Sequence, residues 1–180
     1  MPKKIIMLVL VCILFPAVVF ANQNPNAVPG FDNLTWGESS RSVLQKYHLG
    51  RMPLTYDRNE TICEISLDNP YIYEIRIMPT ALMMFTNDKL YSVTFNFSSY
   101  PNDTEYNQIK KIFTEKFGEP YKTETINGQY EYSSWDKGEF FIGLAMTSIT
   151  FAHNELSLEA QNARDEAQGK NITDWSSYVH

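Results

Sequence analysis

The chain has 180 residues, with 15 lysines and arginines against 21 aspartates and glutamates, and a formal net charge of −6 at pH 7. A mildly acidic chain without a basic cluster is not expected to bind nucleic acid, because that binding depends on neutralising phosphates. The same balance argues against electrostatic attachment to anionic lipid. With 43% hydrophobic and 14% aromatic residues, the chain can bury a core of its own.

The first 21 residues have the features of a secretory signal peptide. Lys3 and Lys4 supply the positive start, a long apolar run follows, and Val19 and Ala21 are the small residues that a signal peptidase reads. An uncleaved anchor is the alternative, but the apolar run is short for a membrane span, which needs about 20 residues. We therefore expect cleavage after Ala21, no stable membrane anchor afterwards, and a periplasmic or secreted protein.

Cysteine usage fits the same location. Cys12 lies in the segment expected to be removed, so Cys63 alone would remain and no intramolecular disulfide could form. Small secreted animal domains usually depend on such bridges, which favours a bacterial envelope. Cys63 lies in an alternating run and is interpreted as a buried, inert thiol.

The N-terminal part of the mature chain is predicted to begin with a disordered leader over residues 22–30, which is polar and contains two prolines. A short apolar segment, residues 31–36, follows. Ser39 then predicts the cap of a helix from Ser40 to about Tyr47, because its hydroxyl can accept a backbone N–H at the helix start.

Three short strands are predicted next, over residues 61–67, 71–78 and 82–85. In the second, the alternation places four residues on one face: Tyr71, Tyr73, Ile75 and Ile77. Pro79 and Thr80 are expected to form the turn between the second and third strands.

The clearest pattern is a strand followed by a helix. Residues 89–97 alternate, with Tyr91, Val93, Phe95 and Phe97 on one face, and a hairpin over residues 86–89 joins this strand to the one before. Asn102 or Asp103 is expected to cap a helix that ends at Gly118, before Pro120. Its apolar stripe is Tyr106, Ile109, Ile112, Phe113 and Phe117.

Beyond this helix the alternation predicts four more strands, over residues 121–126, 129–135, 139–145 and 148–153. Asn127-Gly128 is a strong signal for a two-residue hairpin between the first two. A last helix is expected from Glu155 to Gln168. It would dock only weakly, because its inward stripe consists mostly of alanines, and a polar tail follows it to residue 180.

These elements predict an α+β fold, an antiparallel sheet with helices on one face. The two halves, about residues 31–97 and 98–154, look alike and suggest two α-β-β-β units in tandem. Residues 155–180 would form a C-terminal helix and tail outside this domain.

Two motifs in these halves resemble those of a small secreted or periplasmic bacterial domain of largely uncharacterised function. The first is the opening Phe31-x-x-x-x-Trp36-Gly37-x-Ser39, and the second is the helix end Phe117-Gly118-Glu119-Pro120. The similarity spans roughly residues 31–156. It implies a fold and an envelope location, and no functional residue is transferred from it.

Motifs of known enzymes are missing from the sequence, which has no Gly-x-Ser-x-Gly elbow, no His-Glu-x-x-His and no Cys-x-x-Cys. His48, His153 and His180 lie at the ends of predicted elements or of the chain, where a structural role is favoured over catalysis. Asp57, Glu60 and Glu64 form the densest acidic group, and they are interpreted as solvated surface because a calcium site needs more converging oxygens. We therefore predict no catalytic residue, no metal and no cofactor.

Aromatic residues offer the one candidate surface for binding. Tyr130, Tyr132 and Trp135 could contact a peptide or glycan, although filling the layer between sheet and helices is the favoured role for such rings. The leading hypothesis is an exported, non-catalytic envelope module that binds a protein or peptide partner. The alternatives are an enzyme with a non-local hydrolytic site and a small-ligand carrier.

Overall fold

The computed structural model describes residues 26–31, 33–50, 54–57, 60–126, 128 and 130–168. The expected signal peptide, residues 1–21, and the expected tail, residues 171–180, lie outside these ranges. Over the ranges described, no helix combines the length and apolar character needed to cross a membrane.

Within the described part of its first half, the chain forms one helix and five strands. They are α1 (Ser40–Lys46), β1 (Leu54–Asp57), β2 (Glu60–Ser66), β3 (Tyr71–Ile72), β4 (Ile75–Thr86) and β5 (Lys89–Phe97). The second half forms α2 (Asp103–Phe117), β6 (Lys122–Ile126), β7 (Tyr130–Asp136), β8 (Phe140–Leu144), β9 (Ser148–His153) and α3 (Asn154–Ala167).

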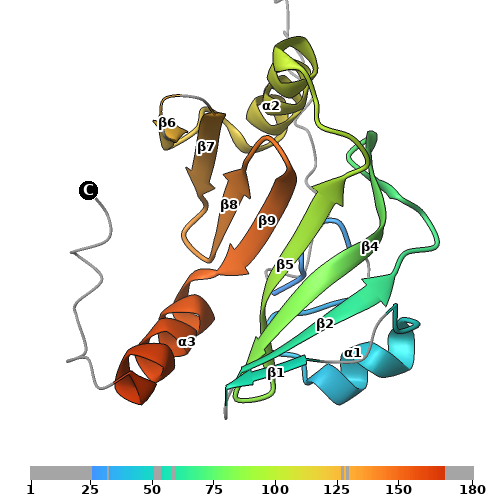
Figure 1. Cartoon of the computed structure of the whole chain (residues 1–180), viewed down its shortest axis with the longest axis vertical. Coiled ribbons are helices and arrows are strands. Elements are labelled where there is room, and N and C mark those ends of the chain that lie inside the picture. Colours follow the sequence, from blue (N-terminus) through green and yellow to red (C-terminus); the bar gives the residue numbers. More distant parts are fainter. Residues whose placement is uncertain are drawn as a thin grey trace, which may run out of the picture.

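The strands form a single antiparallel sheet in the order β1-β2-β4-β5-β9-β8-β7-β6, with the short β3 paired to β4. Each half is a meander, and the two meanders meet where β5 pairs with β9 (Figure 1). The α+β class with an antiparallel sheet is thus confirmed. On this path four strands follow each of the first two helices, one more than the label α-β-β-β counts, and the tandem duplication remains a prediction.

One face of the sheet carries the core, and α1 and α2 cover it. Phe113 of α2 packs its ring 6.2 Å from that of Phe151 on β9 and 5.7 Å from that of Trp135 on β7. Near α1, Phe31 stacks on Phe95 of β5 and meets Tyr47 edge to face. Burial of these large rings is the main source of stability for the layer.

Helix α3 docks elsewhere, against the opposite face of the sheet near the β4–β5 hairpin. Register places Glu60 on that face, and its carboxylate lies 3.9 Å from Arg164 of α3. Glu159 accepts a hydrogen bond of 2.7 Å from Asn87 in the hairpin and pairs with Lys89 at 3.3 Å. The helix is therefore held largely by polar contacts, together with the buried Ala160. In Figure 1, α2 lies at the top of the molecule and α1 and α3 at the bottom.

Two of the predicted strand boundaries are wrong. Residues 71–78 are not one strand, because Tyr73 and Glu74 turn with φ of 49° and 70° and β4 folds back on β3. Positive φ is uncommon for tyrosine, and the residues continue the alternation of a strand, so the sequence does not predict this turn. Conversely, Pro79 and Thr80 lie within β4, where its register with β5 shifts between Ile77 and Ala81. Proline is tolerated at such irregular positions.

Two further sequence predictions need correction. Tyr91 does not share a face with Val93 and Phe95, because a bulge between the Met84 and Phe85 pairings puts its hydroxyl against Met84 and Glu60 on the other face. Part of the predicted disordered leader, residues 26–30, is ordered. Val28 is buried and exchanges backbone contacts with Leu34 and Phe31.

Candidate functional site

The clearest candidate surface is the edge of the sheet at β6, where backbone N–H and C=O groups point out of the sheet. Among the strands that the structure describes, β6 pairs only with β7, and the five residue pairs between them show no shift of register. Lys137 donates a backbone hydrogen bond to Phe140 across the β7–β8 hairpin. The backbone N–H and C=O of successive residues point to opposite sides of an antiparallel strand. Since Lys137 directs its N–H towards β8, the backbone groups of Tyr130, Tyr132 and Ser134 point towards β6.

This alternation fixes which groups of β6 point out of the sheet. Lys122, Glu124 and Ile126 turn their backbone groups towards β7, so Thr123 and Thr125 direct theirs away from it. The two threonines are about 6.8 Å apart along the strand, the spacing at which a neighbouring strand accepts and donates hydrogen bonds. The edge is therefore a template for one more strand.

Exposed apolar side chains surround this edge. Tyr121, just before β6, is 66% exposed, and Ile126 at its end is 44% exposed. Tyr130 lies directly across from Ile126 and is 52% exposed. Near the other end, Lys122 and Glu124 form an ion pair of 2.9 Å. The outward-facing backbone groups of Thr123 and Thr125 are thus flanked by apolar side chains at the Ile126 end, and by the ion pair and the exposed Tyr121 ring at the other end.

Tyr132 lies on the same face as Tyr130, two residues further along β7. Its ring lies across Gly143 of β8, where a Cβ atom would come within 2.5 Å of the phenol oxygen. Burial raises the pKa of Tyr132 to about 12. The ring therefore stays neutral and forms a half-buried floor beside the exposed Tyr130.

Trp135 is not part of this surface. Its side chain is 1% exposed and lies on the helix-covered face, where its indole N–H donates to the Gly118 carbonyl at 2.7 Å. The structure thus brings Tyr130 and Tyr132 together and removes Trp135 from the predicted trio. The sequence carried this signal, because Tyr130 and Tyr132 are two positions apart and share a strand face, whereas Trp135 is three positions from Tyr132 and falls on the opposite face.

Tyr71 and Tyr73, the other aromatics considered from the sequence, also separate. Tyr71 is exposed on β3, whereas Tyr73 packs its ring 5.8 Å from that of Phe113 and 5.7 Å from that of Phe117. The ammonium of Lys116 lies 4.3 Å from the centre of the Tyr73 ring. Burial raises the pKa of Tyr73 well above its ordinary range. Tyr73 is therefore part of the core.

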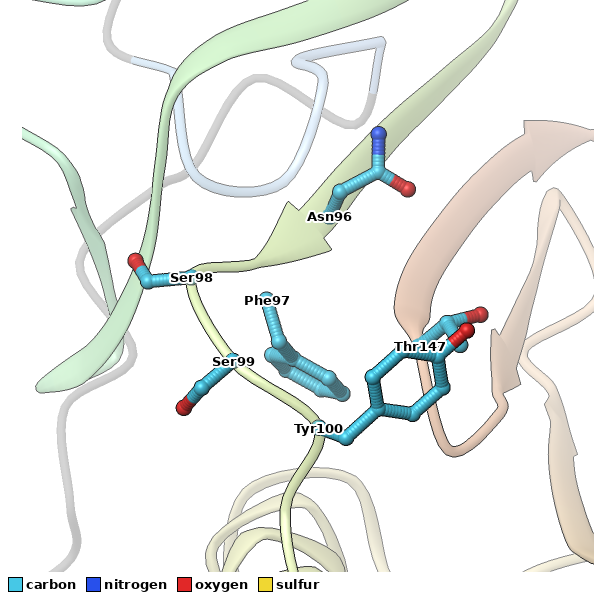
Figure 2. Close-up of a pocket in the computed structure, with 6 residues that line it drawn as sticks. All are labelled: Asn96, Phe97, Ser98, Ser99, Tyr100 and Thr147. Atoms are coloured by element: carbon cyan, nitrogen blue, oxygen red, sulfur yellow. The ribbon is translucent and has the colours of Figure 1, made fainter.

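A second candidate is a small hollow where β5 ends and β9 begins (Figure 2). Its volume is about 210 Å³. Six residues line it: Asn96, Phe97, Ser98, Ser99, Tyr100 and Thr147. No sequence pattern marked these residues, because the loop after β5 and the residue before β9 meet only in the folded sheet.

Beneath α3 lies a polar cluster that the sequence did not reveal. Glu60 accepts a hydrogen bond from the Tyr91 hydroxyl and faces Arg164, so this carboxylate, interpreted from the sequence as solvated surface, is buried. Burial and the adjacent Glu60 carboxylate raise the pKa of Tyr91. Because the three groups satisfy one another, we assign them to the docking of α3.

His153 and Cys63 have structural roles. His153 caps α3 by accepting the Leu156 N–H, and Cys63 is buried with its thiol pKa raised to about 11 by that burial. Within the part of the chain that the structure describes, no three His, Cys, Asp or Glu residues come together as metal ligands would. His180 lies outside it.

No family model matches the chain, and no curated protein does. Among solved structures it is similar to a DUF4309 family protein, YjgB, from Bacillus subtilis, with 9% identity and a TM-score of 0.47. That similarity covers 71% of this chain and 87% of the other.

Proposed function

We propose that this chain is an exported, non-catalytic module of the bacterial cell envelope that binds an extended segment of a partner protein at the β6 edge. The signal-like residues 1–21 support export to the periplasm or beyond. The free backbone of β6 supports the mode of binding, in which the partner adds one strand to the sheet. This second observation carries the proposal.

The two ends of the sheet differ in how well they are protected. Bulges and very short strands discourage strand addition at an edge. At the far end, β1 has four residues and its register with β2 shifts between Thr55 and Asp57. β6 has a regular register and no proline, and its residues are mostly exposed. Strand addition is therefore favoured at β6.

The side chains around β6 indicate the partner's chemistry. An added strand would place alternate side chains beside those of β6 on each face. On the face of Ile126 and Tyr130, an aliphatic or aromatic residue would bury apolar area. Glu124 lies two residues before Ile126 on β6 and pairs with Lys122, so a partner residue beside it fits better if it is polar or charged. The proposed occupant is thus an extended peptide of about five residues with one apolar residue at the Ile126 end.

A proline substitution at the edge tests this mode of binding. Thr125→Pro removes an N–H that points out of the sheet and leaves the bonds between β6 and β7 intact, so the fold should tolerate it. Thr125→Val keeps the N–H and is the matched control. The probe is a displayed library of unstructured heptapeptides, selected on the purified chain.

We expect selected peptides to bind wild type and Thr125→Val alike and to lose at least about tenfold in affinity for Thr125→Pro. Hydrogen exchange at Thr123 and Thr125 in the wild type should slow when peptide is added, which also covers the case in which Thr125→Pro misfolds. Peptides that bind all three forms equally, or that leave both amides unprotected, would rule out strand addition. A chain that pairs with its own copy through β6, seen as a dimer that Thr125→Pro dissolves, would assign the edge to self-association instead.

Export has an independent test. N-terminal sequencing of the protein made in a bacterial host should find Asn22 as the first residue, in the periplasmic fraction or the medium. An intact Met1 in the cytoplasmic fraction would contradict the export part of the proposal.

A further inference from the structure

The hollow between the ends of β5 and β9 is built on fixed backbone. Phe97 donates its N–H to the Thr147 carbonyl at 2.9 Å, which ties the two strands together at the base of the hollow. The Ser98 hydroxyl donates to the Ile77 carbonyl at 2.7 Å and holds the start of the loop. At its other end the loop runs into the capped start of α2 at Asn102. The walls are therefore in place before any ligand arrives, which lowers the entropic cost of binding.

The aromatic part of the lining has one buried and one exposed ring. Phe97 is almost buried, whereas Tyr100 is 78% exposed. In Figure 2 the Tyr100 ring lies beside Thr147, and Asn96 extends from the strand above them. An aromatic ring presents a flat, electron-rich face, which attracts the polarised C–H groups of a ligand laid against it.

The polar part of the lining is neutral, and apart from Ser98 its side chains have no hydrogen-bond partner within the described residues. The side chains of Asn96, Ser99 and Thr147 form no hydrogen bond to any residue within the described ranges, and none of the six lining residues is an acid, a lysine, an arginine or a histidine. The amide of Asn96 offers both donors and an acceptor, and each hydroxyl offers both as well. Such a set recognises a ligand rich in hydroxyl groups, and it offers no counter-charge to an anion or a cation.

From this geometry we infer a binding site for a neutral sugar ring. A hollow of about 210 Å³ holds about seven waters at roughly 30 Å³ each. The hydroxyls of a pyranose can replace the hydrogen bonds of those waters, while its C–H face covers the Tyr100 ring. A purely apolar ligand would leave the amide and hydroxyls without partners, which disfavours it.

The site is tested by saturation-transfer NMR on the full purified chain with neutral monosaccharides at about 10 mM, since a single ring on an open site is expected to bind only in the millimolar range. Glucose, galactose and N-acetylglucosamine serve as probes, with glucuronic acid as the charged comparison. Tyr100→Ala removes the stacking ring, and Tyr100→Phe retains it. Tyr71→Ala is the matched control, because that ring is also exposed but lies outside the hollow.

We expect transfer to the ring protons of at least one neutral sugar, with affinity lowered about fivefold by Tyr100→Ala and less than twofold by Tyr100→Phe or Tyr71→Ala. Thr147→Val should also weaken binding, because it replaces a hydroxyl by a methyl group of similar size. No transfer to any neutral sugar would overturn the inference, as would equal losses in Tyr100→Ala and Tyr71→Ala. Stronger binding of glucuronic acid than of glucose would also overturn it, because the lining holds no cation.

Discussion

The two buried tryptophans of the described core provide a matched pair for testing how the fold is held. The indole N–H of Trp135 donates to the Gly118 carbonyl at 2.7 Å, whereas the indole N–H of Trp36 is buried without a hydrogen-bond partner within the described residues. Replacing either by phenylalanine removes two ring carbons and the N–H. The apolar loss alone costs about 1.6 kcal/mol, at about 0.8 kcal/mol per buried carbon group.

The two substitutions differ because only Trp135 loses a hydrogen bond of its indole N–H. For Trp135→Phe, losing a bond worth roughly 0.5–1.5 kcal/mol brings the total to about 2–3 kcal/mol. For Trp36→Phe, removing a buried N–H that has no partner stabilises the folded state by roughly 1–3 kcal/mol, which offsets the apolar loss. The free energy of unfolding should therefore change little. Urea unfolding followed by far-UV circular dichroism measures both. Equal costs for the two variants, or a larger cost for Trp36→Phe, would refute this reasoning.

Three further perturbations follow from the local geometry. Asn102→Ala should cost about 1 kcal/mol of unfolding free energy, because the side chain accepts two backbone N–H groups at the start of α2, and Asn102→Ser should be close to neutral in the same urea titration. Gly30→Ala should lower the melting temperature more than Gly138→Ala: both have positive φ, but a Cβ on Gly30 would lie 2.7 Å from Ile72, whereas one on Gly138 meets nothing within 4 Å. Burial raises the pKa of Cys63 from 9.0 to about 11, so the folded state holds its proton where the unfolded state releases it. Stability should therefore fall as pH rises from 9 to 11, and the fall should be shallower in Cys63→Ala, measured by denaturation at each pH.

Local chemistry was enough to predict some elements closely. The strand over residues 89–97 matches β5, and the helix from Asn102 to Gly118 matches α2 with its cap at both ends. In the helix, the period of apolar residues and the capping side chains agree, so no distant contact is needed to decide its structure.

Features that depend on distant contacts were not predictable in this way. The turn at Tyr73 carries no glycine or asparagine, and it is held by the packing of that ring on α2. The bulge at Tyr91 depends on how β4 pairs with β5, so alternation along one strand misplaced the side chain. The candidate edge at β6 is an edge only because β5 pairs with β9, a choice made between strands far apart in the chain.

The same pairing has a consequence for biosynthesis. β5 lies near the middle of the chain, but its partner β9 is the last strand of the sheet in sequence order. Ser92, for example, pairs with Ala152, which is synthesised 60 residues later. Until the ribosome has released nearly the whole polypeptide, the first meander has an uncapped flank that invites aggregation. The sheet can therefore be completed only after the C-terminal part of the chain has been made, which delays folding of the first meander until synthesis is nearly finished.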